Sequence, residues 1–150
     1  MATLTWGVKQ SFRGYIDAAG GTIAVAGGAE RAPDGFLFPQ GPESTLAQGP
    51  DGRLTGVGRF QGQVSFNAHG GMLNVVLTDP WVEATEAGLI LTVAASATRR
   101  VAFAKLDADA MTTEGDATVL PTAITLDGMF ILGDHYPPGT VLDPVRLTGL

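Results

Sequence analysis

The first twenty residues carry apolar side chains at the spacing of an α-helix. Four of them stand at positions i, i+4, i+7 and i+8, and therefore on one helical face: Val8, Phe12, Tyr15 and Ile16. Thr5 is placed to cap the start of this helix, and Gly20–Gly21 to end it. Lys9 and Arg13 fall off the apolar face, so we expect both to be solvated. The pattern predicts one N-terminal amphipathic helix.

From residue 22 onward the apolar residues come in short runs, several with the alternation of β-strands. The predicted strands are Thr22–Ala26, Leu54–Phe66, Met72–Thr78, Leu89–Ala95, Val101–Leu106, Ala117–Leu126 and Val141–Leu147. Turn signals join two pairs of runs, which predicts hairpins over 54–78, across Ala68–His69–Gly70–Gly71, and over 89–106, across Thr98–Arg99–Arg100. The proline-rich stretch from Ala29 to Asp51 is predicted to be irregular apart from Phe36–Leu37–Phe38.

Short strands without alternating helices predict a mainly β fold, an antiparallel β-sandwich or barrel-like domain. Besides the N-terminal helix, residues 127–133 are a candidate for a second, short helix. No internal repeat or linker divides the chain, so we expect a single domain over residues 1–150.

Composition narrows the function classes. The chain has 21 Gly and 16% charged residues, against a usual charged share of about 25%, which suits short strands joined by tight turns. A net charge of −6 argues against nucleic acid as a partner. The absence of cysteine excludes thiolate metal sites and disulfides.

Localisation stays open at this level. No apolar run approaches the roughly 20 residues that span a bilayer, so no transmembrane segment is expected. Residues 1–10 lack a basic flank followed by an apolar stretch, so no signal peptide is expected either. A cytoplasmic protein and a mature exported domain with a new initiator methionine are both compatible with this start.

Enzyme signatures are missing. The sequence contains no G-x-S-x-G elbow, no phosphate-binding loop and no dinucleotide fingerprint. Its two histidines, His69 and His135, are far apart and in no metal-ligand spacing. We therefore expect a binding protein and no catalytic residues.

Tyr15 is the residue with the most chemical interest. The simplest interpretation is a core tyrosine whose hydroxyl is satisfied at the rim. The functional alternative is a phenolate that ligates haem iron, since a hard anionic donor suits the ferric state. A free phenol is protonated at neutral pH, so ligation needs the metal, and preferably a hydrogen-bond partner, to favour the anion.

Five further residues could complete such a site. His69, at the tip of the predicted hairpin, is a candidate hydrogen-bond partner for Tyr15, or else an exposed turn residue. Phe12, Phe66 and Met72 could supply the flat apolar wall that a porphyrin needs, or else belong to the core. Tyr136 could pin its loop by packing, or provide a third polar group at the pocket.

Residues 4–16, LTWGVKQSFRGYI, resemble the opening W-G-V-K-x-S-F-R-x-Y-[IV] pattern of the HtaA, or haem-transport-associated, domain family. The resemblance continues through VSFNAHGG at 64–71, LTDP at 77–80 and YPPGTVLDPV at 136–145. It spans nearly the whole chain in order, and the opening motif is its specific part.

The resemblance implies a β-rich domain that binds ferric haem b for haem acquisition, transport or transfer. In the family the tyrosine of the opening motif is the axial ligand, which corresponds to Tyr15, and the hairpin histidine that assists it corresponds to His69. A second tyrosine near the C-terminus corresponds to Tyr136. Family members are commonly secreted or attached to the cell surface.

Partners follow from this role. We expect haem itself and haem-donor or haem-acceptor proteins, and we also consider a homodimer, because an exposed porphyrin edge is an apolar patch. The alternative function is a non-catalytic β-sandwich that binds a glycan or a protein partner. A Soret band in the purified protein would separate the two.

Overall fold

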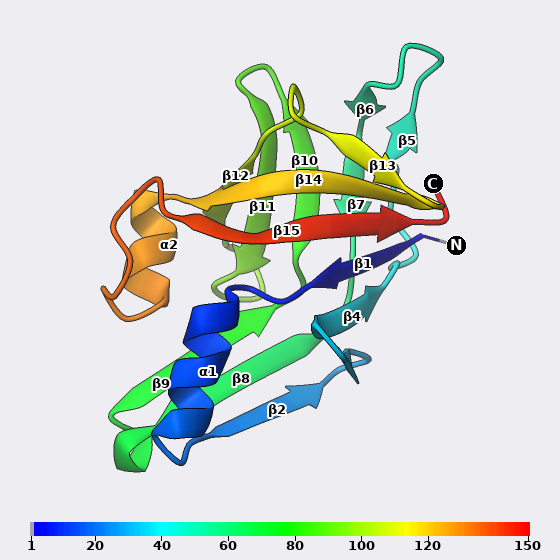
Figure 1. Cartoon of the computed structure of the whole chain (residues 1–150). Helices are drawn as coiled ribbons and strands as arrows, with labels where there is room; N and C mark the ends of the chain where they lie inside the picture. The colour runs from blue at the N-terminus through cyan, green and yellow to red at the C-terminus, as the bar shows by residue number, and fades with distance from the viewer. Residues whose placement is uncertain (1) are drawn as a thin grey trace.

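The protein, seen in a computed structural model that describes residues 2–150, consists of antiparallel sheets and two helices within that range (Figure 1). The helices are α1 (Gln10–Ala18) and α2 (Leu126–Ile131). The strands are β1 (Thr3–Trp6), β2 (Thr22–Ala26), β3 (Glu30–Ala32), β4 (Gly35–Pro39), β5 (Ala47–Gln48), β6 (Leu54–Thr55), β7 (Val57–Arg59), β8 (Gln63–Ala68), β9 (Leu73–Thr78), β10 (Trp81–Thr85), β11 (Gly88–Ala94), β12 (Arg100–Leu106), β13 (Thr112–Glu114), β14 (Ala117–Ile124) and β15 (Val141–Thr148).

The strands form one large sheet and two smaller ones. The large sheet has the order β3-β4-β1-β15-β14-β12-β11-β10-β7, with β13 paired to β14. A three-stranded sheet has the order β2-β8-β9, and β5 pairs with β6. Within the described residues the sheets do not close into a barrel. The predicted fold class, mainly antiparallel β with an N-terminal helix and a short helix near 127–133, is confirmed.

The predicted long strand over 54–66 is wrong. Residues 54–68 instead contribute β6, β7 and β8 to three different sheets. Two glycines with positive φ separate them, Gly56 at 82° and Gly62 at 135°. A Cβ on Gly56 would collide with the Thr45 carbonyl oxygen, so the glycine permits both the turn and the close approach. The hairpin expected over 54–78 is therefore the shorter pair β8–β9.

Six strands were not predicted, namely β1, β3, β4, β5, β10 and β13. β1 pairs with both β4 and β15, and β10 pairs with β7 and β11. β4 is centred on Phe36–Leu37–Phe38, the trio excepted from the predicted irregular stretch, and Pro39 is its last residue. Thr5 lies in β1, so the prediction that it caps the helix is also wrong; α1 begins later, at Gln10. Val8 has a φ of 64° and precedes the helix, although it is buried as expected.

The second predicted hairpin is present as β11–β12, but its turn ends earlier than expected. Arg100, predicted to lie in the turn, begins β12. Its guanidinium carbon lies 3.7 Å from the centroid of the Trp81 ring, and that of Arg59 lies 4.5 Å from the same centroid. The Trp81 indole of β10 therefore has two cation–π contacts, with Arg59 of β7 and with Arg100 of β12.

The core places α1 against the small sheet. Its largest fully buried aromatic side chains are Trp6, Phe12, Phe36, Phe38, Phe60, Phe66 and Phe103. Phe12 of α1 meets Phe66 of β8 with ring centroids 5.0 Å apart, and Phe66 also meets Phe36 of β4 at 5.9 Å. Figure 1 shows α1 lying across β8 and β9, beside the turn that joins them. No helix within residues 2–150 is long and apolar enough to cross a membrane.

Candidate functional site

Tyr15 and His69 meet at the surface of the molecule. Tyr15 lies in the second half of α1, next to the face that buries Phe12 and Ile16, and is itself 41% exposed. Its phenolic oxygen lies 2.5 Å from Nε2 of His69, although 54 residues separate the two in sequence. The simple interpretation of Tyr15 as a core residue is therefore wrong, and the expected partner stands within hydrogen-bond distance.

The turn between β8 and β9 presents His69. It contains a short 3₁₀ segment, η1 (His69–Gly71), in which three successive residues have positive φ: 55° at His69, 65° at Gly70 and 93° at Gly71. Histidine tolerates this region better than most residues, and glycine adopts it freely. From this turn the imidazole of His69 contacts Tyr15 of α1.

The three predicted wall residues divide into two kinds. Phe12 and Phe66 are 1% and 0% exposed, so both rings lie behind the site, in the core, and not at its surface. Met72 directly follows η1 and is 91% exposed. Of the three, Met72 therefore offers an accessible apolar surface, while the two phenylalanines support the elements that carry Tyr15 and His69.

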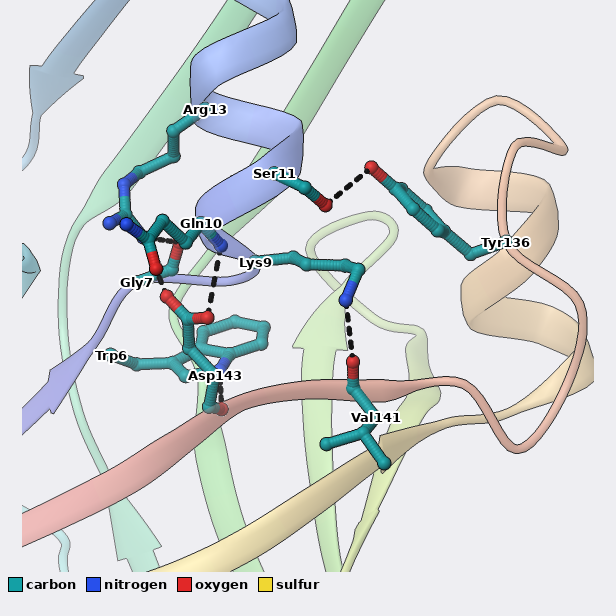
Figure 2. A network of polar contacts seen from close by, with 9 residues as sticks. All are labelled: Trp6, Gly7, Lys9, Gln10, Ser11, Arg13, Tyr136, Val141 and Asp143. Atoms are coloured by element: carbon teal, nitrogen blue, oxygen red, sulfur yellow. Dashed lines mark hydrogen bonds and ion pairs between the residues drawn. The ribbon is translucent and has the colours of Figure 1, made fainter.

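Tyr136 is turned toward the start of α1. Its hydroxyl lies 3.2 Å from Oγ of Ser11, and Nζ of Lys9 lies 5.4 Å from its ring centroid (Figure 2). The same ring centroid lies 6.4 Å from that of Phe12. The ring is half-buried against the core. Of the two roles considered, these contacts favour packing that pins the loop between α2 and β15.

His135 is a third member of the site that was not predicted from the sequence. Its ring centroid lies 5.8 Å from that of Tyr15, with the planes inclined by 47°, while the His69 centroid lies 5.7 Å away. Both histidines of the chain therefore flank the same phenol. The sequence held one indication of this role, because His135 directly precedes Tyr136 in the C-terminal motif. The contact between His135 and Tyr15 could not be predicted, because 120 residues separate them along the chain.

Asp143 on β15 fixes the start of α1. Its two carboxylate oxygens accept hydrogen bonds from the backbone N–H of Gln10 at 2.9 Å and from Arg13 at 2.6 Å (Figure 2). Arg13 also donates to the carbonyl of Gly7 at 2.7 Å, and the Trp6 indole donates to the Asp143 carbonyl at 3.0 Å. The Asp143 carboxylate, 133 residues from Gln10 in sequence, therefore caps the N-terminus of α1. Its negative charge also interacts favourably with the helix dipole there.

This network corrects the expectation that Lys9 and Arg13 are solvated. The Arg13 side chain is 17% exposed and forms an ion pair with Asp143. Lys9 donates from Nζ to the carbonyl of Val141 at 2.9 Å. The residues that open the chain and those of the YPPGTVLDPV segment are therefore in direct contact, and this contact sets where Tyr15 stands.

The arrangement can present one hard oxygen donor to a ligand from solvent. The phenol of Tyr15 is exposed, and its oxygen lies within hydrogen-bond distance of an imidazole. Among residues 2–150 no group of three or more His, Cys, Asp or Glu side chains could hold a bare metal ion.

Fold and site together define a small antiparallel β domain that presents a tyrosine–imidazole pair at its surface. The sequence matches the family model described as Htaa (HtaA) over residues 1–148, and the protein belongs to the HtaA family. A search of curated proteins found no match.

Solved structures share this fold. The N-terminal domain of HtaA from Corynebacterium glutamicum aligns with a TM-score of 0.77 at 23% identity, over 98% of this chain and 96% of that one. The C-terminal domain of the same HtaA gives 0.76 at 23% identity, over 97% and 93%. The heme binding protein HtaB of the same organism gives 0.63 at 19% identity, over 99% and 94%.

Proposed function

We propose that the protein binds ferric haem b, with the phenolate oxygen of Tyr15 as axial ligand and His69 as its hydrogen-bond partner. The observation that carries this proposal is the 2.5 Å contact between the Tyr15 hydroxyl and Nε2 of His69, at an exposed position. An imidazole that accepts the phenolic proton favours the anionic oxygen, which is the form that ligates iron. Membership of the HtaA family and the fold shared with a protein named as heme binding support the same ligand.

The exposure of the site suits carriage of haem as cargo. Because the proposed iron ligand, Tyr15, lies at the surface, haem can bind and dissociate without any opening of the core. Phe12 and Phe66 are buried in that core and stay in place. The exposed Met72 can cover part of one porphyrin face. We therefore propose a non-catalytic role in haem acquisition or transfer, with haem-donor and haem-acceptor proteins as partners.

A hemin titration of the purified protein, followed in the Soret region, tests this function. We expect saturation near one equivalent, with a spectrum distinct from that of free hemin. A strictly linear rise with no saturation would rule out the proposal, and glycans and protein partners would then be screened as ligands of this β domain.

Replacing His69 by alanine is expected to weaken hemin binding by about 10–100-fold, the usual cost of removing a group that orients a metal ligand. The loss is expected to be smaller than that from removing the Tyr15 hydroxyl, because the iron keeps its ligand. Competition with a haem-binding reference protein of known affinity measures both. Equal losses from the two variants would contradict the roles assigned here.

A further inference from the structure

His135 is an exposed imidazole that packs against the Tyr15 ring from a different part of the chain than His69. The centroid distance of 5.8 Å and the inclination of 47° describe a tilted aromatic contact. His69 touches the hydroxyl end of Tyr15, at 2.5 Å from the oxygen. His69 thus contacts Tyr15 through both its hydroxyl and its ring, with ring centroids 5.7 Å apart, whereas the contact recorded for His135 is to the ring.

The loop that carries His135 is held at both ends. On the α2 side, the backbone N–H of Asp134 donates to the Met129 carbonyl at 3.0 Å, and on the β15 side the N–H of Gly139 donates to the Ile124 carbonyl at 2.8 Å. Between these points Tyr136 packs its ring edge on Phe12 and directs its hydroxyl to Ser11. Since Phe12 and Ser11 belong to α1, the loop is fixed to the helix that bears Tyr15.

An exposed tyrosine has rotamer freedom that one hydrogen bond only partly removes. Side-chain ordering costs free energy whenever a ligand requires a single orientation, and pre-organising the side chain removes that cost from binding. A ring packed against the flank of the phenol restricts its rotation while leaving the oxygen free. His135 is placed to do this, and Tyr136 is placed to hold His135.

We propose that His135 is a second positioning residue for Tyr15, and that Tyr136 contributes to the site through it. This inference rests on the proposed haem binding for its affinity readout. It concerns the ring contact and not the imidazole nitrogens, so a phenylalanine at position 135 is expected to fulfil much of the same role.

The test compares His135→Ala with His135→Phe, both at an exposed loop position where loss of folding is not expected. His135→Ala is expected to weaken hemin binding by about tenfold, the lower end for groups that orient a metal ligand. His135→Phe is expected to restore most of that loss. Wild-type affinity in His135→Ala would overturn the proposal, as would equal losses in the two variants, because the second result would assign the effect to the imidazole nitrogens.

A second measurement uses the protein without haem. In NMR spectra we expect nuclear Overhauser contacts between the ring protons of Tyr15 and His69, weakened in His135→Ala and retained in His135→Phe. Tyr15 resonances and contacts that do not change in His135→Ala would overturn the positioning role. If the wild-type protein fails to bind hemin, the proposed function fails, while this measurement still decides whether His135 positions Tyr15.

Discussion

Replacing Tyr15 by phenylalanine is expected to lower hemin affinity by more than about 100-fold, beyond the range usual for groups that only orient a ligand. The substitution removes the single oxygen that we propose as iron ligand and leaves the ring in place. The side chain is 41% exposed and its ring can stay against His135, so the fold is expected to keep its stability. The Soret titration measures the loss, and a thermal melt shows whether the fold is intact.

The matched control is Tyr136→Phe, which removes the only other phenol in the chain. Because that hydroxyl contacts Ser11 and the ring keeps its packing on Phe12, the control is expected to lose far less affinity than Tyr15→Phe. If Tyr15→Phe binds hemin as tightly as the wild type while Tyr136→Phe does not, the ligand is Tyr136 and the assignment made here is wrong.

Replacing Asp143 by alanine is expected to lower the free energy of unfolding by about 2–4 kcal/mol, from a lost helix cap and a lost charge-assisted hydrogen bond. The carboxylate caps Gln10 and pairs with Arg13, and both side chains of the pair are mostly buried, with 17% and 24% exposure. Asp143→Asn keeps an oxygen for the cap but loses the charge, so an intermediate loss is expected. Urea denaturation measures all three proteins.

Glu43→Ala provides the control for a charge pair at the surface. Glu43 pairs with Arg59 at 3.0 Å but is 78% exposed, so its removal is expected to cost less than about 1 kcal/mol. Denaturation midpoints for Asp143→Ala that match those of Glu43→Ala would show that the Asp143 network does not hold α1 in place.

Local patterns in the sequence predicted those elements whose determinants are close together along the chain. The buried helical face through Phe12 and Ile16 was predicted because helical periodicity can be recognised within a short stretch of sequence. β1 and β4 were missed because each is short and is stabilised by partners far away, β15 for the first and β1 for the second. The division of residues 54–68 among three sheets likewise depends on where Gly56 and Gly62 meet distant backbone.

In the candidate site, too, contacts between residues far apart in sequence were the ones not predicted. Tyr15 and His69 were named as candidates from their places in the predicted helix and hairpin, the family resemblance pointed to the same two residues, and the structure brings them together. The buried pairing of Arg13 with Asp143 depends on a partner 130 residues away, which helical periodicity cannot indicate. His135 was set aside because metal-ligand spacing is a local criterion, whereas its contact with Tyr15 arises from loop docking.

Resonance Raman spectroscopy of the hemin complex tests the central claim, that Tyr15 is the iron ligand, most directly. The Tyr136→Phe variant, in which Tyr15 is the only tyrosine left, would be prepared with and without ring-deuterated tyrosine. We predict phenolate ring bands, enhanced through the charge-transfer transition between phenolate and ferric iron, that shift on deuteration. A hemin complex without such bands, or with bands that do not move on deuteration, would contradict ligation by Tyr15.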